Sequence, residues 1–493
     1  MRKLSGFVLL LLAQYSYAQF QYPVTRKVDT VDNYHGTSVP DPYRWLEDDN
    51  SEETKGWVKA QNTVTQNYLS NIPYRDKVRK RLEELWNYSR YSAPFKEGGY
   101  YYFNKNDGLQ NQSVWYRQKA LDAEPEVFLD PNKLSEDGTV SLGSLSFSKN
   151  GKLFVYAIQR AGSDWQEAFV MDAASKKKLS DNIRFLKFTG FAWKGEEGFY
   201  YSRYPEPKQG DNLKGKNLYQ TVYYHKIGTP QSDDVLVYED KTNPQRFANV
   251  SLTEDERFLI LYTSEGTSGR EVWVKDLKAG QKDFSLLIKG FSTQPNVIDN
   301  VGDKLLVRTN DGASNYKVVL IDPKNPAKEA WKELIPEQPN VLQSVGKAGG
   351  FLFPSYLKDA STKVYQYTYD GKQVREINLP GIGSAGGFGG KKEDKEFFYS
   401  FTSYNYPPSI FRYSINSGNT SLFRKAEVKF NPEDYEVKQV FFTSKDGTKV
   451  PMFLTHKKGL VLNGQNPTLM YGYGGFNANE TPGFSVSNLL FME

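Results

Sequence analysis

The fold is decided by stretches such as "FLFPSYLKDASTKVYQYTYDGK", Phe351–Lys372. Two runs rich in aromatic and β-branched residues flank a short polar segment, and "YDGK" at 369–372 supplies a hairpin-type turn. This pattern predicts a strand, a turn and a second strand. Similar short runs, separated by Gly, Asn, Asp and Pro, continue from about residue 92 to residue 425.

The strand pair recurs seven times along the chain. Successive first strands are 45 to 59 residues apart, and each second strand follows its first by 13 to 24 residues. The longest offset contains the polar segment 205–217, which we predict to be a surface loop. Seven such units predict a seven-bladed β-propeller, because radial repetition lets each blade bury its faces against its neighbours. A large β-sandwich with accidental spacing is the alternative. The first strands are read at Tyr100, Phe154, Phe199, Phe258, Leu305, Phe351 and Phe397, and the second strands at Trp115, Phe169, Tyr223, Trp273, Val318, Tyr365 and Phe411.

Two helices are predicted before the propeller, between about residues 50 and 88. Asn50 and Ser51 are possible N-caps, and Glu52 and Glu53 would lie in the first turn, where acidic side chains favour the helix dipole. Pro73 separates the two helical patterns. The apolar positions at helical spacing are Trp57, Gln61, Val64 and Tyr68, then Val78, Leu82, Leu85 and Trp86.

The composition excludes several classes of function. A chain of 493 residues predicts two or three domains, and a net charge of +5 without a basic run argues against a nucleic-acid partner. There is no cysteine, so disulfides and thiolate chemistry are excluded. The three histidines, His35, His225 and His456, have no ligand-like spacing. We therefore expect neither a metal site nor a cofactor.

The N-terminus has the pattern of a secretory signal. Arg2 and Lys3 precede the apolar run "LSGFVLLLLA", and Ser16 and Ala18 occupy the −3 and −1 positions of a cleavage site. We expect cleavage after Ala18 and a periplasmic or secreted protein, with an uncleaved anchor as the alternative. No later segment approaches twenty apolar residues, so we expect no stable membrane association.

The candidate site is "YGYGGF", Tyr471–Phe476. It follows a predicted strand pair at 438–458, with Asp446-Gly447 at the tip, and a short predicted strand in "TLMYGYGGF". Three strands and a glycine loop are how an α/β-hydrolase domain begins, and that loop supplies a donor to the oxyanion hole. A tyrosine hydroxyl can be this donor, and glycines allow the backbone to approach a substrate. A turn with packed tyrosines is the alternative interpretation.

Several longer segments carry a family resemblance. The chain resembles the prolyl oligopeptidase (prolyl endopeptidase) family of serine peptidases from about residue 22 to residue 493. The segments are "DPYRWLED" at 41–48, "SEETKGWVKAQN" at 51–62, "GLQNQSVWY" at 108–116, "FLDPNKLSEDGTVSL" at 128–142, "FFTSKDGTKVPMF" at 441–453 and "YGYGGFN" at 471–477.

The resemblance implies a mainly β fold, a seven-bladed β-propeller inserted in an α/β-hydrolase domain of which only the first part is present. The expected domains are a signal peptide at 1–18 and an N-terminal segment of the peptidase domain at 19–90. They continue with the propeller at 91–427 and the start of the catalytic domain at 428–493.

The resemblance also implies an activity. The family cleaves short peptides after proline with a Ser-Asp-His triad, so the expected partners are short proline-containing peptides. Its oxyanion donor falls on Tyr473, and substrate binding falls on Phe476, Gly474 and Gly475, with Phe476 in the proline pocket. We expect the full-length protein to be a monomer.

One feature departs from the family pattern: no Gly-x-Ser-x-Gly nucleophile elbow occurs in this chain. The nearest segments, "GSLSF" at 143–147, "GTSGR" at 266–270 and "GASNY" at 312–316, do not fit, and the three histidines are poor candidates for the base. We therefore expect a C-terminally truncated chain that lacks Ser, Asp and His of the triad, ends in the apolar strand "SVSNLLFME" and is inactive alone. A split gene, a frameshift and an incomplete record fit equally well. A non-catalytic peptide-binding propeller and a carboxylesterase are the alternative functions.

Overall fold

A computed structural model describes residues 20–207, 215–476 and 478–493. The predicted signal peptide at 1–18 and the middle of the predicted loop at 205–217 lie outside the described residues. The chain divides into two compact units, Met1–Glu83 and Glu84–Glu493. The domain boundaries expected from the resemblance stay predictions. Within the described ranges, no helix combines the length and the apolar character that crossing a membrane requires.

The first unit contains a hairpin and helices. Both predicted helices are confirmed, and the side-chain oxygen of Ser51 accepts a hydrogen bond from the Thr54 N–H at 3.1 Å, which caps the first helix. The elements are β1 (Val31–Tyr34), β2 (Thr37–Pro40), the 3-10 helix η1 (Arg44–Glu47), α1 (Glu52–Ser70) and α2 (Arg75–Trp86), whose last residues belong to the second unit.

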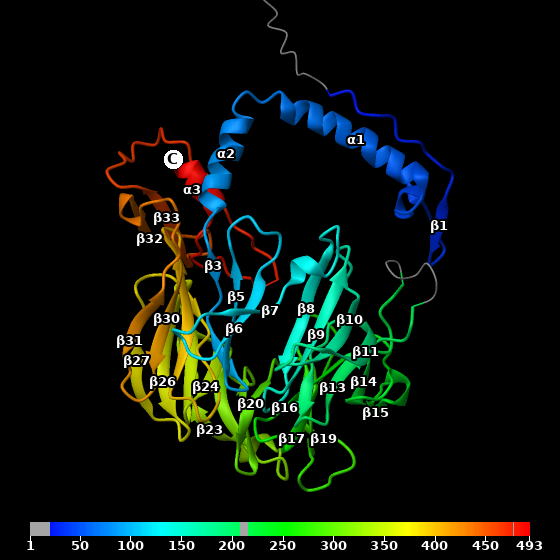
Figure 1. The fold of residues 1–493 in the computed structure, drawn as a ribbon, viewed down its shortest axis with the longest axis vertical. Coiled ribbons are helices and arrows are strands. Elements are labelled where there is room, and N and C mark those ends of the chain that lie inside the picture. Colours follow the sequence, from blue (N-terminus) through cyan, green and yellow to red (C-terminus); the bar gives the residue numbers. More distant parts are fainter. Residues whose placement is uncertain (1–19, 208–214, 477) are drawn as a thin grey trace, which may run out of the picture. The chain divides into compact units, whose positions relative to one another are not determined.

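The second unit contains seven antiparallel sheets, which we number as blades one to seven in chain order (Figure 1). The first blade consists of β3 (Arg90–Tyr91), β4 (Phe95–Glu97), β5 (Tyr100–Asn106), β6 (Val114–Gln118) and β7 (Glu126–Leu129). The second consists of β8 (Val140–Phe147), β9 (Leu153–Arg160), β10 (Gln166–Asp172) and β11 (Lys178–Leu186). The third consists of β12 (Ala192–Lys194), β13 (Gly198–Arg203), β14 (Thr221–Lys226) and β15 (Val235–Tyr238).

The other four blades have four strands each. The fourth consists of β16 (Phe247–Leu252), β17 (Phe258–Ser264), β18 (Glu271–Asp276) and β19 (Ser285–Ile288), and the fifth of β20 (Asn296–Val301), β21 (Lys304–Thr309), β22 (Lys317–Ile321) and β23 (Lys332–Ile335). The sixth consists of β24 (Val341–Ala348), β25 (Phe351–Lys358), β26 (Ser361–Thr368) and β27 (Gln373–Ile377), and the seventh of β28 (Ser384–Gly386), β29 (Glu396–Ser403), β30 (Tyr406–Ser414) and β31 (Thr420–Arg424). Short 3-10 helices are η2 (Pro131–Lys133), η3 (Gln231–Asp233), η4 (Lys328–Ala330) and η5 (Pro432–Asp434).

The seven predicted strand pairs are confirmed, but they are the middle strands of the blades. In blade two, for example, β9 and β10 are the predicted pair, and they lie between β8 and β11. Middle strands are covered on both faces by neighbouring blades, so they are nearly continuous apolar runs: Phe154 to Ile158 are all buried. Outer strands such as β12 and β28 have only three residues, so they were harder to recognise.

Apolar side chains join successive blades. Val155 and Ile183 of blade two pack in one cluster with Trp193 and Phe199 of blade three. Between blades six and seven, the ring centroids of Phe353 and Phe397 lie 4.9 Å apart in an edge-to-face arrangement. Burying one such side chain contributes about 1.5–3 kcal/mol, so these faces supply much of the stability of the propeller.

The ring of blades is closed without a shared strand. Each blade uses only strands that are consecutive in the chain. The orange strands of blade seven nevertheless lie beside the blue and cyan strands of blade one (Figure 1), where the Arg424 guanidinium lies over the Tyr91 ring. Side-chain and backbone contacts must therefore hold the last blade to the first.

One end of the propeller carries such contacts between hairpins. The first strands of neighbouring blades approach one another (β8 with β12, β12 with β16, β20 with β24), so they lie nearest the axis. We call the turns that lead from the strand before it into the second strand of each pair the inner hairpins. They are 98–99, 148–152, 195–197, 253–257, 302–303, 349–350 and 387–395.

Contacts at the inner hairpins link each blade to the next. Gly98 and Gly151 bring blades one and two so close that a Cβ on Gly98 would lie 2.8 Å from the Gly151 carbonyl oxygen. The remaining steps are Ser148 Oγ to Glu196 (2.7 Å), Gly195 N to Glu256 (2.9 Å), Glu254 N to Asp299 (3.0 Å), Lys347 Nζ to Asp299 (2.5 Å), Gly390 N to the Lys347 carbonyl (2.8 Å) and Lys391 Nζ to Glu97 (2.6 Å).

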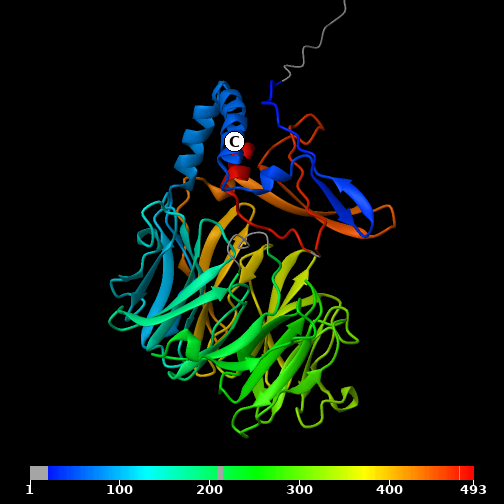
Figure 2. The same cartoon turned by 90° about the vertical axis from the view of Figure 1, so that its right-hand side faces the viewer.

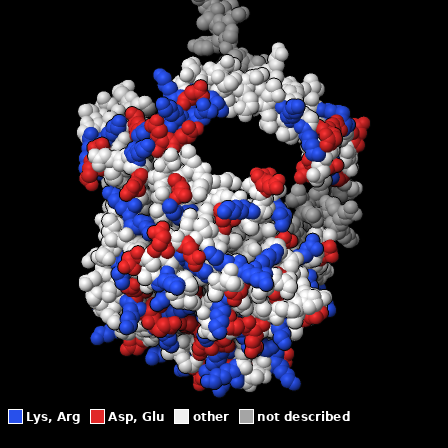
Figure 3. Space-filling model, viewed as in Figure 1, with Lys and Arg blue, Asp and Glu red and all other residues white. Residues whose placement is uncertain are grey.

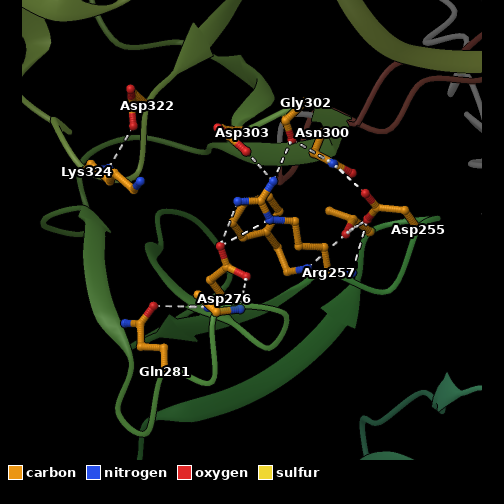
Figure 4. A network of polar contacts seen from close by, with 12 residues as sticks. Asp255, Arg257, Asp276, Gln281, Asn300, Gly302, Asp303, Asp322 and Lys324 are labelled. Atoms are coloured by element: carbon orange, nitrogen blue, oxygen red, sulfur yellow. Dashed lines mark hydrogen bonds and ion pairs between the residues drawn. The ribbon is translucent and has the colours of Figure 1, made fainter.

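The last of these contacts joins blade seven to blade one and completes the circle. Figure 4 shows a neighbouring part of the network, in which Arg257 of blade four contacts Asp276 at 2.9 Å and Asp303 of blade five. One further contact reaches beyond adjacent blades, since the Lys392 N–H of blade seven donates to Glu254 of blade four at 2.9 Å.

We predict that Lys391→Met lowers the free energy of unfolding by about 1–2 kcal/mol, because Glu97 loses the cation that faces it. Burial already raises the pKa of Glu97, although Lys391 opposes this. The control is Lys363→Met, whose partner Glu376 is 39% exposed and lies in the same blade, and which should cost less than about 1 kcal/mol. Urea unfolding measures both variants, and equal losses would contradict an effect of ring closure.

Candidate active-site loop

The hairpin before the loop forms as predicted. β32 (Tyr435–Thr443) pairs antiparallel with β33 (Lys449–Lys457), and this two-stranded ribbon is separate from the propeller sheets (Figure 2). At its tip, Gly447 has φ +87°, and Asp446 accepts a hydrogen bond from the Thr448 N–H at 3.0 Å. The tip therefore lies at Asp446-Gly447, where the sequence predicted it.

Two other strand predictions in this region are wrong. Residues 467–471, predicted as a strand, form none, because no described strand lies beside them to complete the backbone hydrogen bonds. The segment predicted as a C-terminal apolar strand forms the helix α3 (Val486–Met492). Its Val486 and Leu489 are three positions apart and both buried, which is the spacing of one helix face.

The glycine loop presents its aromatic side chains to solvent. Tyr473 is 56% exposed and Phe476 87% exposed. Gly474 has φ +74°, a conformation that a residue with a Cβ adopts only with strain. A Cβ on Gly475 would lie 3.3 Å from the Tyr473 ring, so the glycine gives that ring room. The two glycines thus set the backbone and the position of the neighbouring phenol.

The hydroxyl of Tyr473 makes no hydrogen bond within the described part of the chain. A buried phenol normally finds a partner, whereas this one is exposed on a loop and keeps its proton for another acceptor. The structure places the four predicted site residues within one short turn. Their roles toward a substrate stay predictions.

Neither His35 nor His456 makes a described contact with this loop. His35 lies in the turn between β1 and β2, with φ +52°. His456 lies on β33, where its Nδ1 is 2.9 Å from the Lys457 carbonyl oxygen and its Nε2 is 3.4 Å from Glu436. Among the described residues, no group of three His, Asp or Glu side chains is arranged to hold a metal ion. On the face shown in Figure 3, Lys and Arg are interspersed with Asp and Glu.

His225 is enclosed between two carboxylates inside the propeller. Its Nε2 lies 3.0 Å from Asp181 and its Nδ1 lies 2.7 Å from Asp234, and all three side chains are buried. The Tyr201 hydroxyl donates to Asp234 at 2.6 Å. Burial lowers the pKa of His225, but the hydrogen bonds to Asp181 and Asp234 outweigh it and raise the pKa to about 9. The network joins blades two and three, so its role is structural.

Comparison with known proteins identifies the family. A family model described as "Prolyl oligopeptidase, N-terminal beta-propeller domain" matches residues 22–426. The prolyl endopeptidase of Elizabethkingia meningoseptica is 48% identical over 473 residues, which cover 96% of this chain and 67% of that protein. The chain belongs to the prolyl oligopeptidase family.

Other relatives of the prolyl oligopeptidase family agree. The prolyl endopeptidase of Elizabethkingia miricola is 47% identical over 99% of this chain and 69% of its own length. A solved prolyl endopeptidase structure superimposes with a TM-score of 0.88 at 37% identity, covering 96% of this chain and 70% of that one. Prolyl oligopeptidase B from Galerina marginata, bound to a 25mer macrocyclization substrate, gives 0.87 at 31% identity. The chain thus spans about two thirds of these prolyl oligopeptidases.

We predict that the stability contributed by His225 depends on pH between about 6.5 and 9. The raised pKa means that the folded protein binds the proton more tightly than the unfolded chain, whose value is about 6.5. The contribution is therefore complete below pH 6.5 and lost as pH rises through 9. In urea unfolding, the difference between the parent and His225→Gln should shrink from pH 6 to pH 9.5, and a constant difference would contradict a protonated His225.

Proposed function

We propose that this chain forms the propeller and the first part of the catalytic domain of a serine peptidase that cleaves short peptides after proline. Membership of the prolyl oligopeptidase family supports the reaction class. The observation that carries the proposal is the exposed Tyr473 hydroxyl, without a described partner, in a glycine loop that follows the β32–β33 hairpin.

Tyr473 has the chemistry of an oxyanion donor. When a nucleophile attacks the carbonyl carbon of a peptide bond, the carbonyl oxygen becomes negatively charged, and a positioned O–H donor stabilises that charge. Gly474 and Gly475 leave space for the substrate backbone beside the phenol. The exposed ring of Phe476 can pack against the flat apolar ring of proline. These residues bind and polarise the substrate, but they do not attack it.

Peptide cleavage requires groups that these 493 residues do not supply. The chain has no Gly-x-Ser-x-Gly elbow, and His225 is locked between two buried carboxylates. Members of a catalytic triad act as a unit, so the donor alone retains only a small part of the rate enhancement. We therefore infer that the chain is inactive by itself and that a Ser, an Asp and a His complete the site.

We predict that the 493-residue chain does not cleave a chromogenic Gly-Pro substrate, whereas a longer chain that adds the triad does. In that longer enzyme, Tyr473→Phe should lower kcat by about 10²- to 10³-fold, the cost of one oxyanion donor. KM should change less, because the hydrogen bond strengthens as charge develops. The matched control is Tyr471→Phe, which removes a phenol from the same loop and should leave kcat nearly unchanged.

Steady-state kinetics on the three enzymes separate the outcomes. Robust turnover by the 493-residue chain would contradict the need for an added triad. Equal losses of kcat for Tyr471→Phe and Tyr473→Phe would contradict the specific role of Tyr473. Peptide binding without turnover in the longer enzyme would instead favour a non-catalytic peptide-binding propeller.

We also propose that the protein is exported to the periplasm or secreted. The support is the sequence of residues 1–18, with a basic start, an apolar run and small residues before the cleavage site. Expression with the native N-terminus should yield a mature protein that begins at Gln19. N-terminal sequencing of the exported protein measures this, and an intact Met1 on a protein in the cytosolic fraction would contradict export.

A further inference from the structure

A small cavity lies where the first and last blades meet. Its volume is about 70 Å³, several times the space that one ordered water needs. Its walls come from β3 and the residues before it, from β30, and from the end of β31. These are also the segments by which the chain enters and leaves the propeller. The lining includes Tyr88, Arg90, Tyr91, Pro408, Ile410 and Arg424.

Arg424 brings a positive charge into this cavity without a counter-charge. Its guanidinium carbon lies 4.0 Å from the centre of the Tyr91 ring, and it has no hydrogen bond or ion pair within the described ranges. Burial lowers the pKa of Arg424, and the Tyr91 phenol offsets only part of this. A partly desolvated cation of this kind is stabilised by any anion that reaches it.

Arg90 adds a second guanidinium whose hydrogen bonds all go to neutral groups. Its Nη2 donates to Asn106 Oδ1 at 2.9 Å and to the Gly108 carbonyl at 2.8 Å, and its Nη1 donates to the Trp86 carbonyl at 3.2 Å. By contrast, Arg257 in Figure 4 contacts two carboxylates, Asp276 and Asp303. Neither charge in the cavity is neutralised in this way.

The rest of the lining decides what kind of anion fits. No Asp or Glu is among the described residues that line the cavity, and Lys425 adds a third cation at the lining. Ile410 is buried, and Pro408 and the two tyrosine rings are largely apolar. A fully hydrated oxyanion would leave this apolar surface unused, whereas a carboxylate on a short hydrocarbon would contact both parts.

We propose that this cavity is a binding site for a small organic carboxylate, with its charged end at Arg424 and its apolar end against Ile410 and Pro408. The proposal does not depend on the peptidase activity. Arg90 lies on β3 of blade one and Arg424 ends β31 of blade seven, so a bound carboxylate links the two blades that have no shared strand. Binding therefore stabilises the closed ring.

The test is calorimetric titration and thermal unfolding of the purified chain with sodium propionate, at ionic strength held constant with sodium chloride. Propionate should bind in the millimolar range and raise Tm. Arg424→Gln should weaken binding about tenfold or more, since a charge-assisted hydrogen bond is lost. The matched control is Arg412→Gln on the same blade, whose partner is Glu396 outside the cavity, and it should bind propionate like the parent.

A second variant keeps the proposal testable if Arg424→Gln does not fold. Pro408 is an exposed residue of the lining, so Pro408→Trp should obstruct the cavity and weaken propionate binding while both arginines remain. Propionamide, which has the same shape without the charge, should not raise Tm. The proposal is overturned if propionate fails to bind, if Arg412→Gln and Arg424→Gln lose binding equally, or if inorganic phosphate binds as tightly as propionate.

Discussion

The constraint on which this structure depends is that the seventh blade must meet the first. Each blade is made of consecutive strands, so no strand fastens the end of the propeller to its beginning. The contacts at the inner hairpins take over this task, from the close backbone approach of Gly98 and Gly151 to the ion pair between Lys391 and Glu97. Apolar packing makes the blades adhere, and the polar circle fixes which blade stands next to which.

Charged side chains therefore serve different purposes at different places in one propeller. Arg257 is held by carboxylates from two blades, and His225 is held by Asp181 and Asp234. Arg424 has only aromatic rings around its guanidinium. The first two arrangements are complete within the fold, so they are structural. The third leaves a charge unanswered, and such a place can bind a ligand.

The sequence predicted the features that depend on local pattern and failed where a distant partner decides. The middle strands at Phe351 and Tyr365 were recognised because burial on both faces demands apolar and β-branched residues. The segment 467–471 has the same composition, but a strand needs a neighbour, and the described residues provide none. Tyr473 could be selected from its glycine loop, whereas Arg90 and Arg424 belong to no motif and meet only because the ring closes.

The sequence distance across the contact of Lys391 with Glu97 has a consequence for folding kinetics. These residues are 294 positions apart, while Lys347 and Asp299 are only 48 apart. Loop closure over the longer distance costs about 1.6 kcal/mol more, so the junction of blades seven and one forms efficiently only after the other blades have assembled. The same junction then opens at a lower free energy than global unfolding requires, which makes it the natural boundary for partial opening of the propeller.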